Sequence, residues 1–133
     1  MTQEDKSLLL KDLCARLPYG VKCENFSHTY GRNVFKVTDI RDNGYICGII
    51  NNQYCSSVFD ILELKPYLFP LSSMTEEQKE EYVSLQQRVI YNSQGPVNLD
   101  VIKYVDWLNK NHFDYRGLIE KGLAIDATGL NIY

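Results

Sequence analysis

The chain has 133 residues, of which 44% are hydrophobic and 23% charged, and its formal net charge is −3. This length suits one ordered domain that buries a core without disulfides or metals, and the composition is far from that of a disordered chain. A net negative charge provides no general positive field to collect nucleic-acid phosphates, so a DNA- or RNA-binding protein is disfavoured.

The spacing of the four cysteines matches neither a zinc ribbon nor a CxxC redox motif, so we expect reduced and mostly buried thiols. The start of the chain lacks the basic and apolar segments of a signal peptide. No window reaches the roughly 18 apolar residues of a membrane span. We therefore expect a cytoplasmic protein that does not enter a membrane. The cysteines are Cys14, Cys23, Cys47 and Cys55.

The pattern predicts a first helix over residues 3–16. Thr2 and Asp5 have the spacing of a capping box, in which a hydroxyl and a carboxylate accept from free backbone amides. Leucines then recur at helical spacing, and Pro18 ends the helix.

Residues 20–59 have the short apolar and aromatic runs of an antiparallel meander, small enough to curl into a partial SH3-like barrel. Its best local signal is Asn43-Gly44, typical of a two-residue type I′ turn. That turn predicts that Ile40 faces Cys47 and that Val37 pairs with Ile50.

The rest of the chain predicts a strap, two helices and a tail. The strap, residues 60–72, contains two prolines that favour extended backbone. A helix over 75–92 starts at a capping box of Thr75 and Gln78, and a helix over 99–110 follows the cap Asn98. The tail covers 111–133. The fold prediction is one α+β domain: a helix on a small bent antiparallel meander, then two helices and a docked tail.

The segment from His112 to Arg116 carries the densest group of polar and aromatic side chains. We interpret it first as part of a docked tail, with Asp114 capping a short turn and Arg116 pairing with Asp114, Asp126 or a helix C-terminus. A second interpretation is a partner-binding surface, because its residue types are common at binding hot spots. A third is a small-molecule enzyme or binder at residues 112–116. The partner-binding candidates are Trp107, His112, Tyr115 and Arg116.

Catalytic and cofactor motifs are not apparent. The two histidines, His28 and His112, do not fall in a metal-binding spacing. The chain carries neither a phosphate-binding glycine loop nor a glycine-flanked nucleophile, and the paired acids Glu76-Glu77 and Glu80-Glu81 are typical of a solvated helix face. We therefore name no catalytic residue, metal or cofactor, and we expect a protein that is not an enzyme.

Nucleic-acid binding by the curved sheet is the alternative function. Aromatic rings would stack on bases while basic groups contact phosphates. Glu24, Asp39 and Asp42 nearly cancel those charges. The candidate residues are Lys22, Tyr30, Arg32, Phe35, Lys36 and Arg41.

Three blocks, LCARLPYGV at 13–21, LKPYLFPLSSMT at 64–75 and WLNKNHFDYRGLI at 107–119, resemble small uncharacterised proteins encoded by phages, prophages and mobile elements of gut anaerobic bacteria. The resemblance covers about a quarter of the chain and implies no activity for any residue. Together with the small size, acidic charge and aromatic content, it predicts an accessory protein that binds a host or phage protein. The sequence leaves its oligomeric state open.

Overall fold

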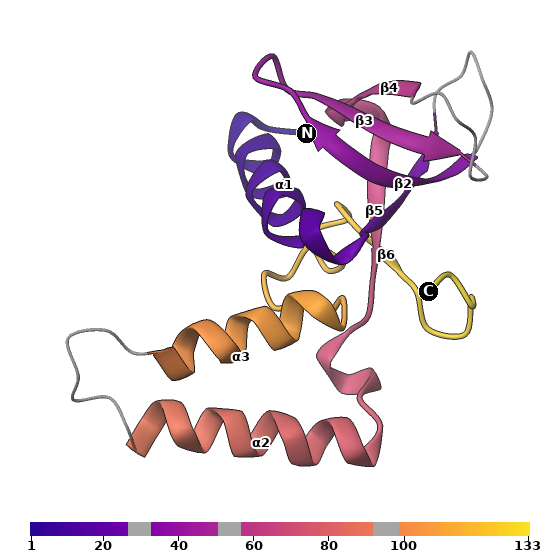
Figure 1. Ribbon diagram of the computed structural model, residues 1–133. Helices are drawn as coiled ribbons and strands as arrows, with labels where there is room; N and C mark the ends of the chain where they lie inside the picture. The colour runs from indigo at the N-terminus through magenta and orange to yellow at the C-terminus, as the bar shows by residue number, and fades with distance from the viewer. Residues whose placement is uncertain (27–32, 51–56, 92–98) are drawn as a thin grey trace.

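The computed structural model describes residues 1–26, 33–50, 57–91 and 99–133 (Figure 1). The fold is α+β, as predicted: an N-terminal helix, a six-stranded sheet and two further helices. Cys55 and the predicted cap Asn98 lie outside the described residues. The elements are α1 (Gln3–Arg16), η1 (Leu17–Tyr19), β1 (Lys22–Asn25), β2 (Asn33–Ile40), β3 (Tyr45–Ile50), β4 (Ser57–Asp60), η2 (Ile61–Glu63), β5 (Leu64–Leu68), η3 (Leu71–Ser73), α2 (Glu76–Tyr91), α3 (Leu99–Lys110) and β6 (Ile125–Asp126).

Helix α1 begins and ends where the sequence predicts. Thr2 and Asp5 form the reciprocal capping box, because each backbone N–H donates to the side chain of the other residue at 3.0 and 3.1 Å. Leu9 and Leu13 are fully buried. The helix therefore places one leucine face on the core, as expected from its spacing.

The sheet has the strand order β4-β3-β2-β1-β5-β6. Strands β1 to β4 form the predicted antiparallel meander, and β5 returns to pair antiparallel with β1. Strand β6 adds to β5 in parallel, so the sheet is mixed. Among the described strands no ladder joins the β4 edge to the β6 edge, and closure into an SH3-like barrel is not confirmed.

The β2–β3 hairpin forms at Asn43-Gly44, but its predicted register is wrong. The backbone of Arg41 bonds to Tyr45, and Gly44 has φ +83°, so the loop has three residues rather than two. A three-residue loop with a left-handed glycine shifts the pairing by one position. Ile40 therefore faces Ile46, and an irregularity between Val37 and Asp39 shifts the register again.

The segment predicted as a strap is extended, but its centre is the strand β5. Strand β5 pairs with the edge of β1 opposite β2, through Leu64, Lys65 and Pro66. Proline favours the same extended backbone in a strap and in a strand, so local sequence does not separate the two structures. Pro66 lacks an N–H, and β6 pairs only with the following two residues of β5.

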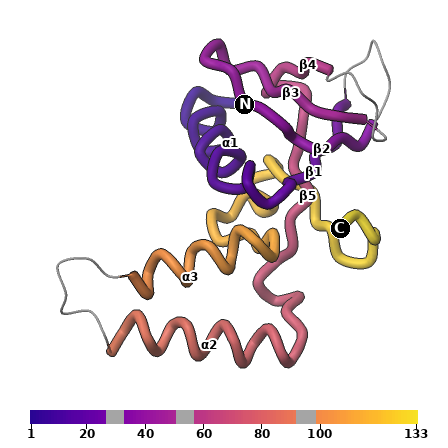
Figure 2. The backbone as a smooth tube through the Cα atoms, in the orientation of Figure 1, coloured from indigo at the N-terminus to yellow at the C-terminus, as the bar shows by residue number. Residues whose placement is uncertain are grey.

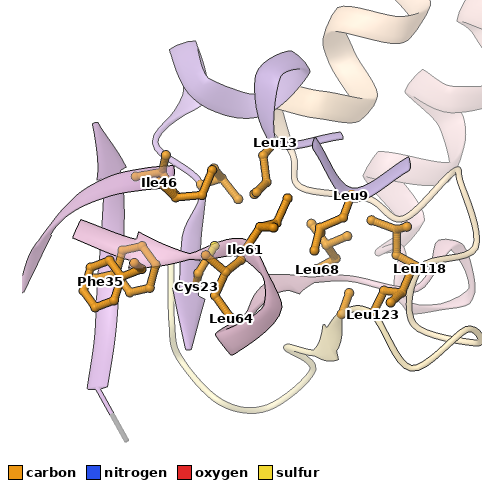
Figure 3. Close-up of a cluster of buried hydrophobic side chains, with 14 residues drawn as sticks. Leu9, Leu13, Cys23, Phe35, Ile46, Ile61, Leu64, Leu68, Leu118 and Leu123 are labelled. Atoms are coloured by element: carbon orange, nitrogen blue, oxygen red, sulfur yellow. The ribbon is translucent and has the colours of Figure 1, made fainter. Parts of the chain in front are cut away.

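The main core lies between α1, the sheet and the tail (Figure 3). Leu118 and Leu123 of the tail enter this core beside Leu9 and Leu68, which confirms that the tail is docked. Cys23 and Cys47 are buried, as expected, but Cys14 is exposed. The buried members of this core are Leu9, Leu13, Val21, Cys23, Phe35, Val37, Ile46, Phe59, Ile61, Leu64, Leu68, Leu118, Leu123 and Ala124.

Helices α2 and α3 lie side by side and run in opposite directions, with α2 farthest from the sheet (Figures 1 and 2). The predicted capping box of α2 is present between Thr75 and Gln78. A second, smaller core of Met74, Leu108 and Phe113 attaches the helices to the body. None of the 16 residues of α2 is fully buried, so this hairpin projects from the domain.

Candidate interaction surface

A buried charge cluster ties the segment after α3 to helix α1. Both oxygens of the Asp12 carboxylate accept from the Arg16 guanidinium, at 2.8 and 3.1 Å, and both side chains are fully buried. Arg16 also donates to the backbone oxygen of Phe113 at 2.6 Å. The Arg16 guanidinium therefore binds both Asp12 and the backbone of the tail.

Arg116 joins this cluster from the tail side. Its Nε lies 3.4 Å from the Asp12 carboxylate, although Asp114 and Asp126 were its predicted partners. Asp114 instead accepts from two backbone amides at 2.9 Å, as the predicted cap of the following turn. The guanidiniums of Arg16 and Arg116 lie 5.3 and 5.1 Å from the centre of the Tyr115 ring. Two cations thus share one buried carboxylate and one aromatic ring.

His112 is buried on the other side of the same segment. Its ring stacks on Tyr133 at 3.7 Å, and its φ of +59° turns the chain out of α3. Burial, together with the charges of Arg16 and Lys22, lowers the pKa of His112 to about 4. The neutral imidazole is therefore the form that this packing favours at neutral pH.

Tyr133 completes the packing around His112. Its hydroxyl accepts from the Lys22 amide at 2.9 Å and donates to the backbone oxygen of Tyr67 at 2.8 Å. This hydroxyl bridges the neighbouring strands β1 and β5. Residues 112–116 thus make contacts that anchor the tail. The pockets described below are lined by other residues.

The structure separates the four predicted partner-binding residues. His112 is buried, and Tyr115 and Arg116 are partly buried within the charge cluster. Trp107 is also partly buried, but it faces α2. Its ring lies 6.2 Å from Tyr82 on one side and 5.6 Å from Phe113 on the other.

Trp107 borders a groove of about 410 Å³ between α2 and α3. Its indole N–H donates to the Glu81 carboxylate at 2.6 Å, which orients both side chains at the groove. The groove combines an aromatic and an aliphatic surface with charges of both signs. Its lining residues are Glu80, Glu81, Ser84, Leu85, Arg88 and Trp107.

Two other pockets lie on the sheet half of the molecule. One, of about 390 Å³, lies between α1, the β2–β3 turn and η2, and contains Lys6, Asp42 and Asp60. Another, of about 510 Å³, includes Phe59 and Glu63. No group of three His, Cys, Asp or Glu side chains in the described part of the chain is arranged to hold a metal ion.

Of the candidate nucleic-acid residues that the structure describes, Lys22 and Lys36 are cross-strand partners on β1 and β2. Phe35 is buried and stacks on Phe59 at 3.9 Å, so its ring is not available to a base. The Lys22 ammonium donates to the backbone oxygen of Ile132 at 2.8 Å. Lys36 and Arg41 are exposed. Tyr30 and Arg32 lie outside the described residues.

Sequence reasoning missed the α2 side of the groove. The sequence pattern of Glu80 and Glu81 is typical of a solvated helix face, and no motif points to Ser84 or Arg88. One feature of the sequence could have indicated this surface. The apolar face of α2, formed by Tyr82, Leu85 and Val89, is narrow, so most of the helix surface is not needed for packing within the domain.

No protein-family model, curated protein or solved structure matches the chain. Within the described ranges, no helix has the length and apolar character needed to cross a membrane.

Proposed function

We propose that this chain is a non-enzymatic accessory protein of the cytoplasm that acts by binding another protein through its α2–α3 hairpin. The observation that carries the proposal is that α2 has no fully buried residue, although the adjacent groove presents Trp107. Tryptophan and arginine are the side chains most enriched at binding hot spots, and the groove holds one of each.

Exposed apolar side chains on both helices of the hairpin support the same surface. Large exposed apolar patches mark interaction sites on soluble proteins. Burial of these side chains against a partner would add to the binding free energy. The exposed apolar residues of the hairpin are Val83, Ile90, Tyr91, Leu99, Val101 and Ile102.

The chemical groups of residues 112–116 support a structural role for that segment. Asp114 caps a turn, Arg116 pairs with Asp12, and His112 packs on Tyr133. We infer that the bent sheet, as a partial SH3-like barrel, together with this anchor forms the rigid body that carries the hairpin. The sequence resemblance to proteins of phages and mobile elements supports a host or phage protein as partner.

A photo-crosslinking amino acid at Ser84 tests the proposal in cells that express the gene. Position 84 lies in the groove, whereas Lys36 on β2 is an exposed control position outside the hairpin. We expect a crosslinked product of defined mass from position 84 but not from position 36. Absence of any protein adduct from position 84, with the variant folded and photoactive, would contradict the proposed function.

A further inference from the structure

We propose that the groove on α2 binds a second copy of this chain, with the two α2 helices antiparallel and Ser84 on the two-fold axis. This inference rests on the proposed function, because it concerns the same hairpin surface and names a second copy, rather than a host or phage protein, as the molecule bound in the groove. The two hairpins together would form a four-helix bundle.

The order of charges along α2 is self-complementary about Ser84. Glu80 and Arg88 lie four residues before and four residues after Ser84, and all three line the groove. At a rise of 1.5 Å per residue, each charge lies about 6 Å along the helix from Ser84. A two-fold rotation through Ser84 therefore places each Glu80 opposite the Arg88 of the other copy, as an isologous interface requires.

The same rotation pairs a second set of exposed side chains. Glu77 and Tyr91 each lie seven residues from Ser84, so the Glu77 carboxylate of one copy faces the Tyr91 hydroxyl of the other. Tyr91 is 80% exposed in the single chain. The two turns before Ser84 thus present carboxylates, and the two turns after Ser84 present a cation and a hydroxyl donor.

These charges are available to a partner. Among the described residues the ion pairs are Asp12 with Arg16, Asp12 with Arg116, and Glu76 with Lys79. Neither Glu80 nor Arg88 takes part in them. Opposite charges that meet across an interface fix its register and disfavour wrong alignments.

The side chain at the crossing point is small. Serine permits the close helix approach of 8–10 Å that lets neighbouring side chains interdigitate. Leu85 and Trp107 border Ser84 in the groove and would lose solvent exposure there. An isolated helix of this length is marginal in water, so a helix without a buried residue gains most from such contact.

Charge reversal tests the arrangement by light scattering coupled to gel filtration and by sedimentation over a hundredfold range of concentration. We expect the unmodified chain to form a dimer. Arg88→Glu or Glu80→Arg alone places like charges opposite each other and should weaken association about tenfold or more. Mixing the two variants restores both ion pairs, because each Arg of one copy then faces a Glu of the other, and should restore the dimer.

Lys79→Glu is the matched control, since it changes the charge of the same helix by the same amount outside the groove lining and should leave the dimer intact. A monomeric unmodified chain, or variants that do not recover association when mixed, would overturn the inference. If the chain is monomeric but position 84 crosslinks to another protein, the second-copy proposal fails while the proposed function stands. Failure of both measurements would reject both.

Discussion

At the level of single residues, the strongest constraint is the carboxylate of Asp12 between two arginines. Burying a charge is costly unless it is paired and hydrogen-bonded, and here two cations from distant parts of the chain converge on one anion. Two guanidiniums face one carboxylate in this cluster, and among the described residues Arg16 Nη1 has no hydrogen-bond partner. Loss of the carboxylate would leave the arginines buried without compensation.

Asp12→Asn should lower the free energy of unfolding by about 3–5 kcal/mol, because removal of one partner leaves buried charge unpaired. Urea unfolding followed by circular dichroism measures the loss. Glu4→Gln is the control, since Glu4 is exposed on the same helix and should change stability by no more than about 0.5 kcal/mol. Equal effects of the two substitutions would contradict a structural role for Asp12.

His112 should make the protein less stable in acid. Its pKa is about 4 in the folded chain against an ordinary value of 6.5, so the unfolded chain binds the proton more readily between these values. Stability rises with pH wherever the unfolded state holds more protons. The contribution of His112 is therefore complete above about pH 6.5 and is lost as the pH falls towards 4.

The measurement is the free energy of unfolding at intervals between pH 7 and pH 4.5. His112→Asn is the comparison, because asparagine tolerates the positive φ at this position and does not titrate. The variant should show a shallower loss of stability on acidification. Parallel pH profiles for the two proteins would contradict the assignment.

At the level of elements, α2 depends on its ends and on one narrow face. The capping box of Thr75 and Gln78 provides hydrogen-bond partners for its N-terminus. On the apolar face, the Tyr104 hydroxyl donates to the Tyr82 hydroxyl at 3.2 Å. By contrast, α1 buries Leu9 and Leu13 completely. The free energy of local opening should therefore be lower for α2 than for α1.

Thr75→Ala should destabilise α2 locally by about 1 kcal/mol, because the variant lacks the side-chain acceptor for the Gln78 amide. Amide hydrogen exchange read by mass spectrometry should show faster exchange in 76–91 and little change in α1. Thr38→Ala removes a hydroxyl that donates to the Cys47 backbone oxygen at 3.3 Å in the sheet, and so controls for loss of a threonine hydrogen bond outside α2. Uniformly faster exchange throughout the chain would show that α2 is not a separate opening unit.

At the level of the whole molecule, the tail joins the two ends of the chain. Leu118 packs in the core with α1 and the sheet, β6 extends β5, and Tyr133 contacts the first strand. An aromatic series from Tyr82 through Trp107 to Phe113 connects the hairpin with this body. The tail is therefore a structural part of the domain rather than an appendage.

Leu118→Ala should cost about 2–5 kcal/mol, since it removes a fully buried side chain and leaves a cavity. Leu130→Ala alters a tail leucine that is 50% exposed, and it should cost far less. Thermal unfolding followed by the fluorescence of Trp107 and by far-ultraviolet circular dichroism gives both values. Similar costs for the two leucines would contradict the docked tail.

The sequence by itself determined the elements whose signals are local. Capping residues and apolar spacing define α1 and α2, apolar spacing defines α3, and Asn43-Gly44 places a hairpin turn. The register of that hairpin was not predictable, because two- and three-residue loops both accept these residues and differ by one pairing position. The strand β5 was missed since its hydrogen bonds require the edge of β1, about 40 residues earlier in the chain.

Tertiary structure alone decided the candidate site. Asp12 and Arg116 are far apart in sequence, and their pairing holds the most polar segment of the tail against α1. The groove likewise arises only where Ser84 and Arg88 of α2 meet Trp107 of α3. Periodicity reports which face of a helix is apolar, but burial of the other faces depends on which neighbours the fold supplies.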